Sequence, residues 1–263
     1  MESATLAAIN GWFTRFVGGF TGESAADQRN YDLKVEHTQR VCTIMRRIAA
    51  AEGLSPAAMR LAEAVAICHD VGRFPQYQRY RTFNDATSVN HGALAVHTLK
   101  EQKILDGMLR AERELLLHAV ALHNVFSLPS GLSPELELLT KLIRDADKLD
   151  IWRVLIEYCT APAEQQATAV VWELPTTGEC SLAVIGEITA GRMVDRALLR
   201  TADDFKLLQL SWVFDLNFRE SIAILEEADY IEILAGLLPD QPACQRAVEV
   251  VRKYVANRGG FSA

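Results

Sequence analysis

The stretch Ala66-Ile67-Cys68-His69-Asp70-Val71-Gly72-Arg73 decides how the rest of the chain is interpreted. Apolar residues recur at helical spacing before the histidine, which places His69 on the apolar side of a helix that Gly72 ends. Asp70 follows directly, and a carboxylate turned toward a helical core is costly unless a positive group meets it. A divalent cation bound by both His69 and Asp70 would supply this positive group. The plainer alternative is a histidine at the end of a helix beside a solvated aspartate.

The composition is that of a helical and acidic protein. Among 263 residues, 49% are apolar, glycine (15) and proline (8) are sparse, and the net charge is −7. These totals predict an all-α fold and argue against a protein that binds nucleic acid polymers. No apolar run has the length of a membrane span, and the basic start of a signal peptide is missing, so we expect no membrane association and a cytoplasmic location.

The cysteine spacing and the absence of a linker-like stretch predict a single domain without disulfides. Cysteines without a CxxC pair predict reduced thiols rather than a disulfide framework; they are Cys42, Cys68, Cys159, Cys180 and Cys244. No stretch rich in Pro, Gly or Ser separates two halves, so we predict a single all-α domain over residues 1–263. Residues 160–263 would form a helical extension packed on the catalytic core.

Helical periodicity recurs along most of the chain. It predicts a helix that His91 opens and others over about 6–17, 31–51, 56–70, 111–124, 134–158, 182–199, 205–227 and 240–257. Residues 72–90 show little periodicity and are expected to form a loop, and Val170-Val171-Trp172 is expected to be a short extended piece. The sequence therefore describes a helical bundle with a loop after the His–Asp pair.

Other inward-facing groups supply partners for His69 and Asp70. His37 occupies an apolar stripe near the start of its helix, and Asp147 projects from an apolar seam as Asp70 does. Two imidazoles and two carboxylates together suit a transition-metal ion. A first metal site is therefore expected where these four side chains meet.

Two further histidines are candidates for a second metal site. His91 opens a helix and His123 ends one, each on an inward stripe, and the Asp70 carboxylate can bridge two ions. The alternative is a pair of neutral histidines bonded to backbone carbonyls. We expect one or two divalent transition-metal ions, drawn from Mn, Fe, Co, Ni and Zn.

The segment after the His–Asp pair is locally basic. It holds Arg73, Arg79 and Arg81 against a single acid, Asp85. Arginines in this position favour an anion site, with solvated surface arginines as the alternative, and we take these three as substrate-binding candidates. The catalytic candidates are Asp70, Arg73 and Lys148.

These motifs resemble the HD-domain metal-dependent phosphohydrolase superfamily, in which the order H…HD…D falls on successive helices. Four segments resemble a bacterial subgroup of HD proteins without an assigned substrate: HDVGRFPQYQRYRTFND at 69–85, VNH at 89–91, LHN at 122–124 and LIRDADKLD at 142–150. The resemblance covers about 31–158, which would be the metal-binding HD core of a single-domain helical bundle. It implies that the first-metal ligands are His37, His69, Asp70 and Asp147, and that the second-metal histidines are His91 and His123.

The resemblance implies a phosphomonoesterase or phosphodiesterase that acts on a small phosphorylated molecule, such as a nucleotide, through a metal-bound hydroxide. His123-Asn124 stands where cyclic-dinucleotide phosphodiesterases often carry two histidines, and their Gly-Tyr-Pro signature is absent, which counts against that substrate. Four histidines and two aspartates also match the ligand count of di-iron oxygenases that resemble inositol oxygenase. A non-catalytic HD-like signalling module is the third alternative, and assembly into a homo-oligomer is left open.

Overall fold

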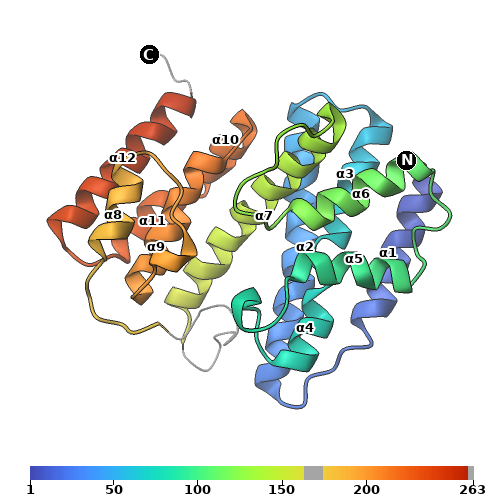
Figure 1. Ribbon diagram of the computed structural model, residues 1–263, viewed down its shortest axis with the longest axis horizontal. Helices are drawn as coiled ribbons and strands as arrows, with labels where there is room; N and C mark the ends of the chain where they lie inside the picture. The colour runs from blue at the N-terminus through green and yellow to red at the C-terminus, as the bar shows by residue number, and fades with distance from the viewer. Residues whose placement is uncertain (163–173, 260–263) are drawn as a thin grey trace. The chain divides into compact units, whose positions relative to one another are not determined.

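The computed structural model describes residues 1–162 and 174–259, which form helices, turns and loops without a strand (Figure 1). The all-α class predicted from the sequence is therefore confirmed. None of the described helices combines the length and the apolar composition that a membrane-spanning segment requires. The chain divides into two compact units, Met1–Asp150 and the described residues from Ile151 onward. The single domain expected over 1–263, with a core at 31–158 and an extension at 160–263, stays a prediction.

Side chains at the N-termini explain where helices of the first unit begin. Ser24, Ser55 and Asn90 each accept a hydrogen bond from a backbone N–H in the first turn of the following helix. Pro56 occupies a first position in which its missing N–H costs nothing. The helices are α1 (Ser3–Val17), α2 (Ala25–Ala51), α3 (Pro56–Cys68), α4 (Arg73–Tyr80), α5 (His91–Glu101), α6 (Arg110–Leu122) and the part of α7 (Pro134–Thr160) that ends at Asp150.

The second half of helix α3 is enclosed by other helices of the first unit. The helix packs against α1, α2 and α6, and residues 64–68 are at most 2% exposed. Its alanines leave room for close packing against the buried side chains of its neighbours. These include Val41, Met45 and Ile48 of α2 and Leu116, Ala119 and Val120 of α6. The end of α3, where His69 and Asp70 follow, is therefore enclosed by protein.

The segment expected to be a loop contains a helix, α4. Its apolar side consists of Phe74 and Tyr77, both buried, so only two residues carry the helical period. Pro75 falls in the first turn, where proline is tolerated. The prediction of a loop over 72–90 was wrong for 73–80, because so short an apolar pattern is hidden among arginines and glutamines.

The second unit contains the remainder of α7, and two of its predicted helices are shorter than expected. The helix predicted over 182–199 ends at Thr189. The one predicted over 205–227 is interrupted after Asp215, whose carbonyl accepts a hydrogen bond from the Asn217 side chain that competes with helical bonds. The predicted piece Val170-Val171-Trp172 lies outside the described residues. The remaining helices are α8 (Leu182–Thr189), α9 (Ala202–Ser211), α10 (Arg219–Glu227), α11 (Tyr230–Gly236) and α12 (Pro242–Gly259).

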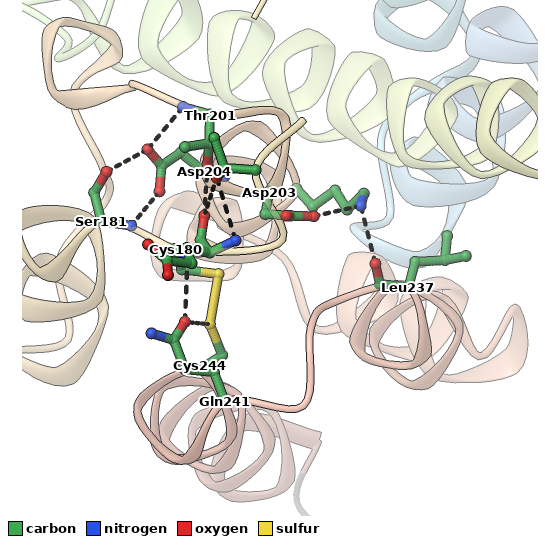
Figure 2. Close-up of a disulfide and its surroundings, with 11 residues drawn as sticks. Cys180, Ser181, Thr201, Asp203, Asp204, Leu237, Gln241 and Cys244 are labelled. Carbon is green, nitrogen blue, oxygen red and sulfur yellow. Dashed lines mark hydrogen bonds and ion pairs between the residues drawn. A yellow bond between two sulfur atoms is a disulfide. The ribbon is translucent and has the colours of Figure 1, made fainter. Parts of the chain in front are cut away.

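Two cysteines of the second unit form a disulfide, Cys180–Cys244 (Figure 2). The prediction of reduced thiols was wrong for this pair. Cys180 precedes α8 and Cys244 lies near the start of α12, and the packing of these helices brings the two Cα atoms to 6.8 Å although 64 residues separate them. A separation of this length leaves no local pattern to detect. The free cysteines are Cys42, Cys68 and Cys159.

Candidate metal centre

The first candidate group brings together four side chains of the first unit. His37 comes from α2, His69 and Asp70 follow α3, and Asp147 comes from α7. The Nε2 atoms of His37 and His69 lie 3.3 Å apart. Asp147 Oδ1 lies 3.1 Å and 3.7 Å from these two nitrogens, and Asp70 Oδ2 lies 3.5 Å and 3.9 Å from them. All four residues predicted for a first metal therefore meet.

The second candidate group shares Asp70 with the first. His91 begins α5, His123 follows α6, and their Nε2 atoms lie 2.9 Å apart. Asp70 Oδ1 lies 3.5 Å from His91 Nε2. Asp70 thus directs Oδ2 toward the first group and Oδ1 toward the second. The four histidines and Asp70 are at most 5% exposed, whereas the Asp147 side chain is 16% exposed.

One histidine of each group is bonded to a carboxylate. His37 Nδ1 lies 2.7 Å from Asp150 Oδ2, and His91 Nδ1 lies 2.6 Å from Asp85 Oδ2. An ionised carboxylate only accepts hydrogen bonds, so Nδ1 carries the proton and donates it. Such a bond orients the ring and makes the Nε2 atom a better metal ligand.

The other histidine of each group ends a helix and bonds back to it. His69 Nδ1 donates to Ala66 O and His123 Nδ1 donates to Val120 O, both at 2.7 Å. Because a carbonyl oxygen only accepts, Nδ1 carries the proton in these rings too. The alternative in which His91 and His123 both bond to backbone carbonyls therefore holds for His123 alone.

The Nε2 lone pairs of the paired histidines face each other, which indicates that each group can bind a cation. With Nδ1 protonated, each neutral ring has a lone pair on Nε2, and within the groups these nitrogens face each other at 3.3 Å and 2.9 Å. Such lone pairs repel unless a proton or a cation lies near both. In each group, ligand atoms of three side chains lie within 4.8 Å of one another, and nitrogen and oxygen donors of this kind bind transition-metal ions. The residues present therefore fit a metal ion in each group.

The surroundings keep Asp70, Asp147 and His123 in the forms that bind metal. Burial alone would raise the pKa of Asp70, but the nearby Lys34 and Arg73 cations hold that pKa well below its ordinary value. Burial is likewise outweighed at Asp147, where hydrogen bonds with histidines hold the pKa well below its ordinary value. Burial, together with the other histidines, lowers the pKa of His123 to about 3. At neutral pH the two carboxylates are ionised and His123 is neutral, as metal binding requires.

Asp150 and Asp85 orient histidines, a role that was not predicted from the sequence for either carboxylate. Asp150 accepts a hydrogen bond from Arg40 Nε at 2.6 Å, and Asp85 accepts one from Arg73 Nη1 at 2.9 Å. Asp150 could have been found, since it follows Asp147 by three positions on the inward side of a helix. Asp85 begins a short 3-10 turn, and no periodic pattern marks it.

Arg73, one of the predicted substrate-binding residues, borders the second group. Its Nε donates to Asp70 Oδ1 at 3.3 Å, and its Nη1 donates to Asp85 and to Phe83 O. Its Nη2 forms no hydrogen bond with the described residues. Nε and Nη1 are therefore committed to the protein, and Nη2 retains donor capacity.

The other predicted substrate and catalytic residues lie apart from the histidines or face the protein. Arg79 is exposed, and Arg81 pairs with Glu23 and Asp27 in the segment before α2 and its first turn. Lys148 is buried on α7, with Nζ 3.5 Å from a carbonyl of its own helix. Their roles in substrate binding and catalysis stay predictions.

The turn between α3 and α4 packs tightly against the start of α5. A Cβ atom at Gly72 would lie 2.3 Å from His91 O and 2.6 Å from Ala95 N. Only glycine allows two backbones to approach so closely. This contact fixes the His69-Asp70 turn against the helix that carries His91.

Two adjoining groups of histidines and aspartates, joined by one carboxylate, define a helical domain whose side chains could hold metal ions. Comparison with protein families agrees, since residues 35–152 match the family model of the HD domain. The resemblance to the HD-domain metal-dependent phosphohydrolase superfamily is therefore confirmed for these residues. In the same comparisons, no curated protein and no solved structure matches the chain.

Proposed function

We propose that this protein is a metal-dependent phosphohydrolase that acts on a small phosphorylated molecule. The observation that carries the proposal is the position of Asp70, whose two oxygens face two separate histidine pairs. Neighbouring ions that share a carboxylate are an arrangement that phosphoryl transfer uses, because both the attacking and the leaving oxygen need charge stabilisation. The HD domain of the chain supports the same class of reaction.

Each group of side chains would have a defined task in this reaction. Divalent ions bound here would make water a stronger nucleophile and offset the charge of the phosphoryl group. Asp150 and Asp85 would keep one ring of each group in the orientation that turns its Nε2 inward. Arg73 would hold a phosphate oxygen through Nη2, since guanidinium and phosphate form strong charge-assisted hydrogen bonds. The metal ligands would be His37, His69, Asp70, His91, His123 and Asp147.

Metal analysis of the purified protein, followed by hydrolysis assays, tests the proposal. The substrates are p-nitrophenyl phosphate, its bis-ester, nucleotides and cyclic dinucleotides. We expect bound transition metal and hydrolysis of at least one of these classes, with activity lost on chelation and restored by added metal. Metal-loaded protein that hydrolyses none of them would contradict the proposal. Iron content with consumption of O₂ would point instead to the oxygenase alternative.

Two histidines on α5 provide a matched pair of variants. His91 belongs to the second group, whereas His97 is exposed and pairs with Glu101. His91→Ala should lose about half of the bound metal and lower hydrolysis by orders of magnitude, because one ion cannot stabilise both reacting oxygens. His97→Ala should keep both properties. Equal activity in the two variants would contradict a second metal ion. The remaining candidate would be a mononuclear site with His37, His69, Asp70 and Asp147.

A further inference from the structure

Lys34 reaches the candidate centre from α2, one turn before His37. Its Nζ donates to Asp70 Oδ2 at 2.7 Å and lies 5.2 Å from the centre of the Phe83 ring. An ammonium group has three N–H donors, and the bond to Asp70 is the one hydrogen bond that this Nζ makes with the described residues. Donor capacity is therefore left for a ligand.

Arg73 occupies the corresponding position on the other oxygen of Asp70. Its Nε donates to Asp70 Oδ1 at 3.3 Å, and its guanidinium carbon lies 5.8 Å from the centre of the same Phe83 ring. The side chains of Lys34 and Arg73 are 12% and 14% exposed, against 3% for Asp70. Solvent, and hence a substrate, reaches these two cations more readily than the carboxylate between them.

The position of Lys34 beside Asp70 is not explained by the need to neutralise the carboxylate, once metal is bound. Divalent ions held by Asp70 would offset its charge themselves, and they would repel an ammonium group this close. The repulsion is relieved if an anion lies beside both the ions and the lysine. The position of Lys34 is therefore that of a group that binds an anionic ligand together with the metal centre.

We propose that Lys34 binds a terminal phosphoryl group of the substrate on the side of the first histidine pair, opposite Arg73. This inference rests on the proposed phosphohydrolase function. A terminal phosphoryl group has three unesterified oxygens and up to two negative charges, so it can accept hydrogen bonds from both cations while it faces the metal ligands. A phosphodiester has two such oxygens and one charge. The substrate class is therefore a compound with a terminal phosphoryl group, as in a phosphate monoester or a nucleoside polyphosphate, and not a phosphodiester.

Equilibrium binding of inorganic phosphate and of dimethyl phosphate to the metal-loaded full chain tests the proposal without any turnover. Wild-type protein should bind inorganic phosphate at least ~10-fold more tightly than dimethyl phosphate. Lys34→Met should weaken phosphate binding about 10-fold or more, the usual effect of losing a hydrogen bond between charged groups, and should weaken dimethyl phosphate binding less. Lys253→Met removes an exposed lysine of α12 that pairs with Glu249, and this control should bind like wild type.

Metal content, measured in every sample, separates the outcomes. Equal phosphate affinity in Lys34→Met and wild type overturns the proposal, and so does a loss of affinity that merely follows a loss of metal. If Lys34→Met does not fold, wild-type protein answers the question, because bound phosphate should protect the Lys34 amine from acylation. Unchanged reactivity would overturn the proposal. Phosphate binding through Lys34 without hydrolysis of any ester would contradict the proposed function and leave the phosphate site standing.

Discussion

Two buried aspartates, one in each unit, have opposite surroundings. Asp70 is 2% exposed and Asp204 is 0% exposed. Asp204 accepts hydrogen bonds from the backbone N–H groups of Ser181, Arg200 and Thr201 at 2.7, 2.8 and 3.1 Å, and from the Ser181 hydroxyl at 2.6 Å (Figure 2). These neutral donors satisfy both of its oxygens and fix the start of α9, where Thr201 and Asp204 form a capping box.

Asp70 has partners of a different kind. Among the described residues, its oxygens receive hydrogen bonds from Lys34 and Arg73, and they face the ring nitrogens of His37 and His91. A carboxylate satisfied by backbone N–H groups has little capacity left for a ligand, whereas one between cations and nitrogen lone pairs can bind metal. Burial alone therefore does not distinguish a structural carboxylate from a functional one; the chemical type of its partners does.

The change with the largest expected effect is Asp70→Asn, which keeps the shape of the side chain and removes its charge. We expect both groups to lose metal and hydrolysis to fall by orders of magnitude, because both depend on this carboxylate. Metal analysis and the hydrolysis assay measure the effect. Asp204→Asn is the control and should keep its metal. Full metal content in Asp70→Asn would place Asp70 in the same structural class as Asp204.

Removal of metal should destabilise the first unit and spare the second. A metal present at 100 to 1,000 times its dissociation constant stabilises the folded state that binds it by about 3–4 kcal/mol, and chelation removes that contribution. Hydrogen exchange with and without chelator measures it separately in each unit. Peptides from α3 should lose protection, while those from α12 should not. Unchanged protection of α3 would argue against a bound metal.

Reduction of Cys180–Cys244 should destabilise the second unit and spare the first. The bond joins residues separated by 64 positions, and loss of a disulfide that closes a loop of this size typically costs about 2–4 kcal/mol. Urea unfolding with and without reductant measures the change in the free energy of unfolding, and metal analysis accompanies it. A reduced protein that loses its metal would show that the centre depends on the second unit.

Asp204→Asn should have the smallest effect, about 1–3 kcal/mol of stability in the second unit. The new amide places N–H donors against backbone N–H donors, which leaves buried groups unsatisfied. Asp195→Asn is the matched control, since Asp195 is an exposed residue that also accepts from a backbone N–H, that of Ala197. Asparagine caps such a turn as well as aspartate does. Urea unfolding should show almost no change for this control.

The residues of the candidate metal centre could be brought together from the sequence because each is a polar group on an apolar helical stripe. His37 and Asp147 were identified from residues a few positions away, and local spacing alone places them inward. Lys34 and Asp85 were missed because their roles depend on contacts between distant segments; 36 residues separate Lys34 from Asp70. On its own helix, Lys34 has the pattern of an ordinary surface lysine whose stem covers apolar neighbours.

The same distinction holds for the fold. Composition and long helical periods predicted the all-α class, because many residues contribute to each. Helix α4 was missed because Phe74 and Tyr77 alone mark its buried side. The disulfide was missed because the packing of α8 on α12, and no feature near either cysteine, brings Cys180 to Cys244. What the sequence concealed were short elements and pairings between distant segments.

Gly72 determines how far apart the two histidine pairs lie, although it provides no ligand. The room that a methyl group would need at this position is taken by the backbone of α5, at His91 O and Ala95 N. With alanine there, α5 would have to move outward and take the His91 ring with it, while Asp70 stayed with its own turn. Every ligand would still be present, but two bound ions would no longer be spaced to act on the same phosphorus atom. The glycine after the His–Asp pair thus controls how His91 is placed against Asp70, and with it whether one carboxylate can serve both groups.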